Sequence, residues 1–361
     1  MGNEFEFDAI GWKAIDDAIE RIYRKQEPVH YGTEVPFFLG GKDPLQGVSI
    51  YRNKSDSKEQ GDYWHYVTYG FSELYEKESD DLELSGYGFE LTFRLAVSPQ
   101  EKDAPIWPVD FLQNLGRYVF ETGNRFAPGH HLELNGPIEI ESPDTSIRAV
   151  AMIEDDLFQM ISTPNGWIEF VQVVGTTEAE NRAILSWNGV SVLEAMRKWN
   201  PSLVTDLNRP CLMESDEFAE AVQDGARTEG SSTGMSFAQE LKIERLASDS
   251  IEVTIGALET ADLLKTLPYR IPFGREYGIL GEPSGALFAP ENWEGAKTAH
   301  SDENREEEGL ELISLTQSDV DTIVETLQPV RGEYRINPQL LIRVVPSVIL
   351  DAEDNPIQEI G

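Results

Sequence analysis

The sequence predicts an α+β fold with two domains, each a mixed or mainly antiparallel sheet with packed helices. Three observations lead to this prediction. The chain has 361 residues, it mixes alternating and helical hydrophobic patterns without a regular βαβ rhythm, and a small, polar stretch interrupts it near residue 230. We expect domains at 1–225 and 237–350, with a linker at 226–236 and a tail at 351–361.

The first predicted element is an amphipathic helix within residues 8–25, DAIGWKAIDDAIERIYRK. Lys and Arg fill its last turn, as is usual at the carboxyl end of a helix. Apolar residues recur at helical spacing along one side. These are Ile15, Ala18, Ile19 and Ile22.

Two strands rich in aromatic residues are predicted at 63–71 and 87–95. In YWHYVTYGF both odd and even positions are mostly apolar, which is typical of a central strand covered on both faces. YGFELTFRL alternates instead, and its polar positions are Glu90, Thr92 and Arg94. We therefore expect a strand with one buried face there.

The remaining elements are predicted from helix-capping residues, β-branched runs and turn residues. The first domain should contain a strand at 48–52, a helix from Trp107 to the C-cap Gly123, a strand at 167–175 and helices at 176–187 and 190–199. The second should contain strands at 237–246, 250–256 and 339–350, a helix at 259–267, and a helix at 316–328 with Thr316 as N-cap and Asp319 three residues on. An acidic loop is expected at 289–309.

Charge is the strongest feature of the composition. There are 65 Asp and Glu residues against 29 Lys and Arg, and 29 − 65 = −36. Such a surface repels nucleic-acid phosphates and anionic membranes, which excludes both as direct partners and favours a basic protein or peptide. Solubility alone is the alternative explanation of the charge.

The compartment is inferred from three absences in the sequence. Cys211 is the single cysteine, so an internal disulfide is excluded, which fits a reducing compartment. The first ten residues carry no signal-peptide pattern, and no apolar run approaches membrane-spanning length. We expect a cytoplasmic protein.

Histidines are the first candidates for catalysis or metal binding. They stand at positions 30, 65, 130, 131 and 300. No zinc, P-loop, nucleophile-elbow or dinucleotide-binding motif is present, and we expect no metal and no cofactor. His65 lies in an aromatic strand, where a core histidine is favoured over a catalytic base. His130 and His131 are adjacent on an extended segment, so they point to opposite faces and are poor co-ligands.

The carboxylates of Glu154, Asp155 and Asp156 are the other candidates. They could bind a metal or a basic group, but solvated loop carboxylates are the more ordinary interpretation. A hydrolytic enzyme that uses His130 with Glu154 and Asp155 remains an alternative. The residues taken by themselves modestly favour binding over catalysis.

Four strings occur in an order and spacing that resemble one family. They are GGKDPLQGVSIYRN, WHYVTYGFSELY, SGYGFELTFRL and WPVDFLQNLGRYVF. Together they look like the amino-terminal domain of the Suppressor of fused family, over most of residues 1–225, while the second half is similar only in layout. The acidity and the short insert are more similar to a bacterial homologue than to an animal one. The resemblance also makes His65 a residue of the fold.

The resemblance implies a non-enzymatic, two-domain clamp that captures an extended peptide by β-addition. Animal members are cytoplasmic inhibitors that bind Gli transcription factors in Hedgehog signalling. Carried over by position, the resemblance makes Tyr118 in GRYVF and Asp155 in IEDD peptide-facing residues. His130 replaces a carboxylate that the animal proteins place after a Phe-x-x-Gly turn, so this chain departs from the animal pattern there.

The predicted function is therefore that of a binding protein with no catalytic residues. Bacterial relatives of the family often resemble immunity proteins of polymorphic toxin systems, which implies neutralisation of a basic toxin. The residues predicted to bind the partner are Tyr118, His130 and Asp155. A bacterial signalling scaffold is a second alternative, beside the hydrolytic enzyme.

Overall fold

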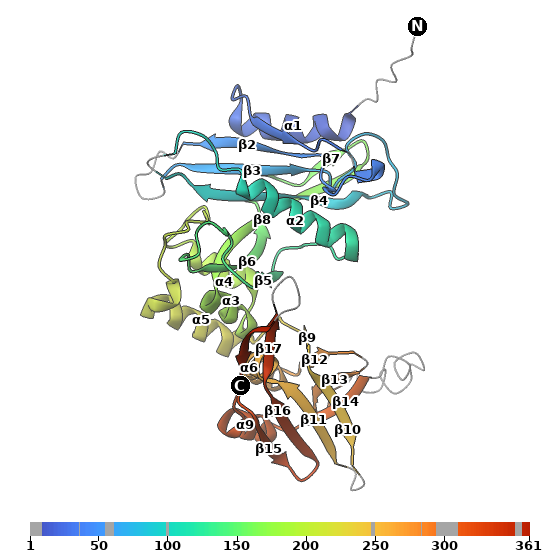
Figure 1. Ribbon diagram of the computed structural model, residues 1–361, viewed down its shortest axis with the longest axis vertical. Coiled ribbons are helices and arrows are strands. Elements are labelled where there is room, and N and C mark those ends of the chain that lie inside the picture. The colour runs from blue at the N-terminus through green and yellow to red at the C-terminus, as the bar shows by residue number, and fades with distance from the viewer. Residues whose placement is uncertain are drawn as a thin grey trace. The chain divides into compact units, whose positions relative to one another are not determined.

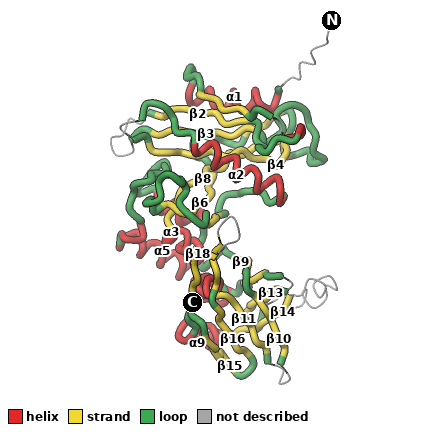
Figure 2. Tube along the Cα trace, in the orientation of Figure 1, coloured by secondary structure: helices red, strands yellow, loops and turns green. Residues whose placement is uncertain are grey.

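The structure is a computed structural model whose chain divides into two compact units. It describes residues 9–35, 37–54, 61–98, 101–246, 250–282, 284–293, 310–350 and 356–361. Unit 1 takes in residues 1–181 and 189–219, and unit 2 takes in residues 182–188 and 220–361. Figure 1 follows the chain from blue to red, and Figure 2 shows helices mixed with strands in both units. The predicted domain limits at 225 and 237 stay a prediction.

Unit 1 is built on an eight-stranded mixed sheet. Its order is β1-β2-β3-β4-β8-β6-β5, with β7 paired to β8 beside this path, and β4 and β8 are its parallel pair. The strands are β1 Val29–Gly32, β2 Gly47–Asn53, β3 Tyr63–Tyr69, β4 Leu84–Ala96, β5 His131–Glu133, β6 Ile147–Glu154, β7 Ile161–Thr163 and β8 Gly166–Thr177. The expected strands at 48–52, 63–71, 87–95 and 167–175 are thereby confirmed.

Helices α1 Ile10–Tyr23 and α2 Trp107–Thr122 cover the two faces of this sheet. Helix α4 Gly189–Met196 packs against β6, while α3 Glu178–Ser186 and α5 Asp216–Glu229 are each divided between the two units. Short 3-10 turns lie at Phe37–Leu39 and Leu212–Glu214. The predicted signals for α2 are confirmed, because Pro108 lies in its first turn and Gly123 ends it in the left-handed conformation, φ 74°. In α1 the buried side includes Ile15, Ala18 and Ile19, as its periodicity predicts.

The sheet has two separate cores. On the α2 side Trp64, Tyr66 and Phe93 belong to one apolar cluster, while Val67 and Tyr69 belong to another on the α1 side. Because the two sets alternate along β3, this strand is buried on both faces, as predicted.

The expectation of a single buried face on β4 is wrong. Glu90, Thr92 and Arg94 are all 0 % exposed, like the apolar residues between them. The reason is that the α1-side core covers their face as well, so alternation along β4 marks a polar interior and not solvent. Each of these three side chains then needs hydrogen-bond partners inside the protein.

The polar stretch that predicts a linker is helical as far as Glu229, the end of α5. Its small residues serve packing here. Gly225 lies so close to the ring of Trp187 that a side chain would collide with it, and Ala226 is buried. A run of small residues is therefore not enough, by itself, to predict irregular structure in this part of the chain.

Unit 2 contains two four-stranded sheets, ordered β10-β11-β16-β15 and β14-β13-β12-β9, and a hairpin of β17 with β18. The strands are β9 Met235–Phe237, β10 Leu241–Arg245, β11 Ile251–Gly256, β12 Tyr277–Leu280, β13 Gly285–Pro290, β14 Leu310–Leu315, β15 Gly332–Asn337, β16 Leu340–Val345, β17 Ser347–Leu350 and β18 Pro356–Ile360. The helices are α6 Ala257–Thr266 and α9 Gln317–Thr326, with 3-10 turns at Leu267–Tyr269 and Ile271–Phe273. Apolar residues of both sheets share one core.

Two sequence predictions for unit 2 have clear outcomes, and a third falls mostly outside the described residues. The capping box is confirmed, because Thr316 accepts from the Asp319 N–H at 3.0 Å and Asp319 accepts from the Thr316 N–H at 2.9 Å. The single strand at 339–350 is wrong: it divides at Pro346 into β16 and β17, and β17 pairs with β18 in the expected tail. Of the expected acidic loop, Pro290 ends β13, and residues 294–309 lie outside the described residues.

Candidate functional site

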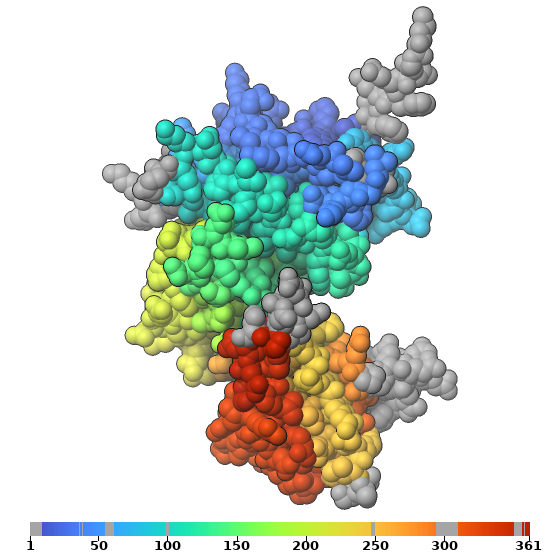
Figure 3. All heavy atoms as spheres, viewed as in Figure 1, coloured from blue at the N-terminus to red at the C-terminus, as the bar shows by residue number. Residues whose placement is uncertain are grey.

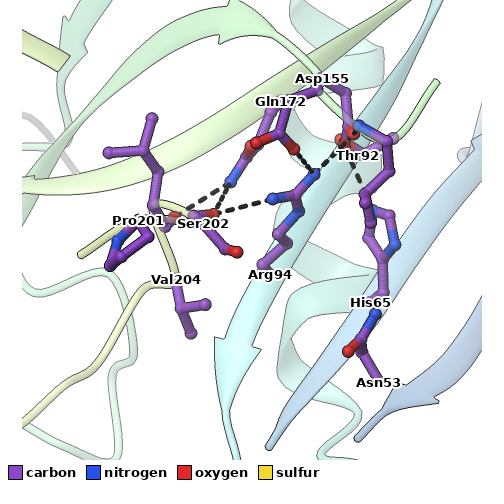
Figure 4. Close-up of polar contacts among 12 residues, drawn as sticks. Asn53, His65, Thr92, Arg94, Asp155, Gln172, Pro201, Ser202 and Val204 are labelled. Carbon is purple, nitrogen blue, oxygen red and sulfur yellow. Dashed lines mark hydrogen bonds and ion pairs between the residues drawn. The ribbon is translucent and has the colours of Figure 1, made fainter. Parts of the chain in front are cut away.

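A charged cluster lies buried on the α1 side of the sheet in unit 1. Its central residues are His65 from β3, Arg94 from β4 and Asp155 directly after β6, and all three side chains are 0 % exposed (Figure 4). The fold brings them together because His65 is the register partner of Arg94 and β8 lies between β4 and β6. A single buried charge costs several kcal/mol, so each member depends on the others.

Arg94 bonds to two carboxylates and to one main-chain carbonyl. Its Nη2 donates to Asp155 Oδ1 and to Asp156 Oδ1, each at 2.6 Å, and its Nη1 donates to the Ser202 carbonyl at 2.9 Å. Gln172 Nε2 donates to the same carbonyl at 3.1 Å, as Figure 4 shows. The guanidinium thus fastens two loops, one after β6 and one after α4, to the centre of the sheet.

The carboxylate of Asp155 is fully engaged by its surroundings. Oδ1 accepts from Arg94 and from the Leu157 N–H at 2.8 Å, while Oδ2 accepts from the Thr92 hydroxyl at 2.5 Å. Burial alone would raise the pKa of Asp155, but the contact with His65 and the charge of Arg94 hold the pKa well below its usual range. Asp155 is therefore ionised at neutral pH.

His65 completes the cluster as a neutral ring. Burial lowers the pKa of His65, although Asp155 partly opposes this. Nδ1 lies 2.8 Å from the Tyr23 hydroxyl, whose pKa burial raises, so the phenol keeps its proton and donates it to Nδ1. Nε2 then carries the ring proton and faces Asp155 Oδ2 at 3.3 Å, too poorly aligned for a hydrogen bond. The interpretation of His65 as a core residue is confirmed.

The three residues predicted to bind a partner do not meet at one place. Tyr118 lies on α2 with its ring stacked on Phe126, in the α2-side layer, and its hydroxyl accepts from Asn124 at 3.2 Å. Asp155 lies in the α1-side layer, so the sheet separates the two. The interpretation of Asp155 as a solvated loop carboxylate is wrong, because Arg94 and the covering core enclose it.

His130 is exposed and immediately precedes β5. Its carbonyl accepts from the Met152 N–H at 2.8 Å. Within the described part of the chain, no hydrogen bond joins its ring to Glu154 or Asp155, so the acid–base pair of the enzyme alternative is not assembled. In the same ranges no group of three or more His, Cys, Asp or Glu side chains is placed to hold a metal ion. The role of Tyr118, His130 and Asp155 in partner binding stays a prediction.

Strand β5 is one of the two edge strands of the unit 1 sheet, and β1 is the other. Its pairs with β6 are His131 with Ala151, Leu132 with Val150 and Glu133 with Ala149. Flanking bonds from Met152 N–H to the His130 carbonyl and from Leu134 N–H to the Arg148 carbonyl fix which residues bond to β6. By the antiparallel alternation, the backbone groups of His131 and Glu133 point away from β6.

Sequence reasoning missed this edge and the cluster around Arg94. The signal for the cluster was present, because one arginine and one histidine stand in the middle of two adjacent aromatic strands. The signal for the edge was weaker, since β5 is only three residues long. Neither the register of β3 and β4 nor the position of β5 can be derived from local pattern.

In the described part of the chain, no helix is both long enough and apolar enough to span a bilayer.

Comparison with known proteins identifies one family. Residues 41–210 match the family described as Suppressor of fused protein (SUFU). Over 235 residues the chain is 37% identical to the Suppressor of fused homolog of Homo sapiens and to that of Mus musculus. The match covers 61% of this chain and 48% of each relative, so the chain spans about half the length of these proteins.

Solved structures agree with the predicted fold. Drosophila Suppressor of Fused superposes with a TM-score of 0.75 at 21% identity, covering 93% of this chain and 97% of that one. A chain of the Sufu-Fu complex superposes with a TM-score of 0.55 at 29% identity, covering 60% of this chain and 97% of that one. The resemblance and the α+β fold class predicted from the sequence are confirmed.

Proposed function

Residues 41–210 belong to the Suppressor of fused family, and on that premise we propose that the chain is a protein-binding regulator that captures an extended segment of its partner by β-addition. Protein binding is the coarse property of the family, as the Sufu-Fu complex illustrates for a relative. The observation that carries the finer proposal is the free edge of β5.

The edge offers an incoming strand a short but complete set of main-chain contacts. His131 and Glu133 each direct an N–H and a C=O away from β6, so a partner strand can form four hydrogen bonds there. Such bonds give affinity without reading sequence, and alternate side chains of the partner give selectivity. His130, exposed at the start of the edge, is the predicted partner-binding residue that lies beside it.

Hydrogen bonds to β6 and to the turn before β5 order the edge strand without a partner. The Gly129 N–H donates to the Met152 carbonyl at 2.8 Å, which anchors the turn before β5. At the same end, three residues after Met152, the chain of β6 reaches Asp155, which accepts hydrogen bonds from Arg94 and Thr92. A strand that is already ordered loses little conformational freedom on binding, which favours affinity.

The partner that we propose is basic. The net charge of −36 attracts positively charged proteins and speeds their encounter. The more specific role of an immunity protein that neutralises a basic toxin is part of this proposal, and the charge is its support.

The test uses peptides selected from a phage-displayed library on the full chain. Bound peptides should slow hydrogen exchange at the amides of His131 and Glu133. Glu133→Pro should still fold, because proline is tolerated on an edge strand when its nitrogen faces outward. It removes an N–H that the partner strand needs, and should therefore abolish binding. Glu133→Gln keeps the N–H and should retain binding, which controls for the side chain. Selected peptides that protect other amides, and that bind Glu133→Pro normally, would refute β-addition here.

A further inference from the structure

Unit 1 contains a second surface feature, a groove with a volume of about 1490 Å³. Its lining residues fall within three parts of the chain, 95–98 with 101–110, 139–146 and 206–209, and no residue of β5 lines it. Figure 3 shows the green segment around residue 140 exposed at the surface. The groove is therefore separate from the edge that carries the proposed function.

Negative charge dominates the walls of this groove. The carboxylates are Glu101, Asp110, Glu139, Glu141, Asp144 and Asp206. Among the described residues none of the six forms an ion pair with Lys, Arg or His. Arg209 is the cation on the walls, and it donates to both oxygens of the buried Glu180 at 2.6 Å each. Its charge is thus neutralised from within, and the groove has an excess of negative charge.

Apolar side chains are exposed on the same walls. Ile106 is 53% exposed and Ile140 is 88% exposed, and both line the groove. Leu207 and Val97, which are only partly buried, add to the apolar surface. Exposed aliphatic side chains beside uncompensated carboxylates suit a ligand that is cationic and apolar at once.

A metal ion does not fit this combination. A divalent cation needs several oxygens converging on one point, whereas no group of three such side chains in the described ranges is placed to hold one. A small polyamine would satisfy the carboxylates but would leave Ile106 and Ile140 without apolar contact. A protein segment that carries Lys or Arg next to aliphatic residues satisfies both.

We propose that this groove docks a basic segment of a protein partner through its six carboxylates and through Ile106 and Ile140. The proposal rests on the proposed function only in taking a protein as the ligand, and it does not require β-addition. The groove sets the chemistry of the segment, and the β5 edge sets a separate main-chain contact. A partner with both features would bind at two places on unit 1, which raises its effective concentration at each.

The test measures binding of a short fluorescent peptide of alternating Lys and Leu to the full chain at low salt. The groove variant is Glu139→Gln, Glu141→Gln and Asp144→Asn combined. The matched control is Glu20→Gln, Asp80→Asn and Glu121→Gln combined, which changes the net charge equally at exposed positions of unit 1 outside the groove. We expect about tenfold weaker binding for the groove variant and less than about twofold for the control.

The apolar contribution is tested with Ile106→Ser and Ile140→Ser. Each should weaken binding of the Lys-Leu peptide by about threefold and leave a Lys-Gly peptide unaffected. Spermine should compete only weakly. Glu133→Pro should not change the affinity for the Lys-Leu peptide, which separates this proposal from β-addition. Equal losses in the groove and control triples, or full competition by spermine, would show attraction by overall charge and overturn the docking site.

Discussion

The two faces of β4 are equally buried but are stabilised by different interactions. On the α2 side, Phe89, Leu91 and Phe93 pack in an apolar cluster. On the α1 side, Glu90 and Arg94 have the same zero exposure and rely on hydrogen bonds and ion pairs. Apolar packing tolerates a change of shape, whereas a buried charge needs its partner in place. The ion pairs of the polar face therefore determine where β6 and the loop after it lie relative to β4.

The largest expected effect comes from removing the central charge of the polar face. Arg94→Met should lower the free energy of unfolding of unit 1 by about 3 to 5 kcal/mol, because it leaves Asp155 buried without its cation. Leu91→Met makes a matched change on the apolar face and should cost about 1 kcal/mol. Native-state hydrogen exchange of the β4 amides reports both. Similar costs for the two variants would show that the ion pairs add nothing to the stability of this face.

The next effect is the pH dependence of Glu90. Burial raises the pKa of Glu90 to about 7, although the Ser72 and Thr68 hydroxyls and the Gly70 and Ser72 N–H groups oppose this by hydrogen bonding to it. The folded pKa exceeds the unfolded value of about 4.3, so stability falls as pH rises between these two values. The loss should reach about 4 kcal/mol at most above pH 7.

Glu90→Gln tests this directly. The amide oxygen can still accept from Ser72 and Gly70, and the amide nitrogen can donate to Thr68. The variant should therefore be more stable than the natural chain at about pH 8 and about equal at pH 4. Unfolding by urea at both pH values measures the difference. A natural chain whose stability is constant from pH 4 to about pH 8 would show that Glu90 does not titrate there.

The contrast between the faces explains which features the sequence could predict. Features that depend on neighbours in sequence were predicted, such as Gly123 at the end of α2 and the Thr316 capping box. The polar face of β4 was not, because the partners of Arg94 lie 61 and 62 residues away at Asp155 and Asp156. Alternation shows that two faces differ, but only tertiary packing decides whether the polar face meets solvent.

The same distinction applies to the candidate site. The family resemblance names Tyr118 and Asp155 from strings of sequence, yet their separation by the sheet depends on how α1 and α2 cover it. The edge at β5 depends on strand order, which no local pattern reports. Local chemistry could therefore supply candidate residues, and topology decided which of them share a surface.

A third effect should appear in acid. The folded pKa of Asp155 is depressed, so its stabilising contribution is present above the unfolded pKa of about 3.9 and is lost as pH falls below it. We expect a loss of about 1 kcal/mol between about pH 4 and pH 3. In Asp155→Asn this part of the loss should disappear, although the variant is less stable throughout. Thermal unfolding across that pH range measures it, and an unchanged acid slope in Asp155→Asn would contradict the assignment.

The smallest expected effect is the coupling between Tyr118 and Asp155, which should be close to zero. Tyr118 lies on α2 and stacks on Phe126, whereas Asp155 is enclosed on the opposite face by Arg94 and Thr92. A partner segment that touches Tyr118 therefore cannot use the Asp155 carboxylate while the cluster is intact. A double-mutant cycle of Tyr118→Ala and Asp155→Asn, measured on binding of a selected peptide, should give less than about 0.5 kcal/mol. Tyr118→Phe is the control for loss of the hydroxyl alone. A coupling energy above about 1 kcal/mol would mean that binding opens the buried cluster and brings both residues to one ligand, and the two faces of β4 would then not act independently.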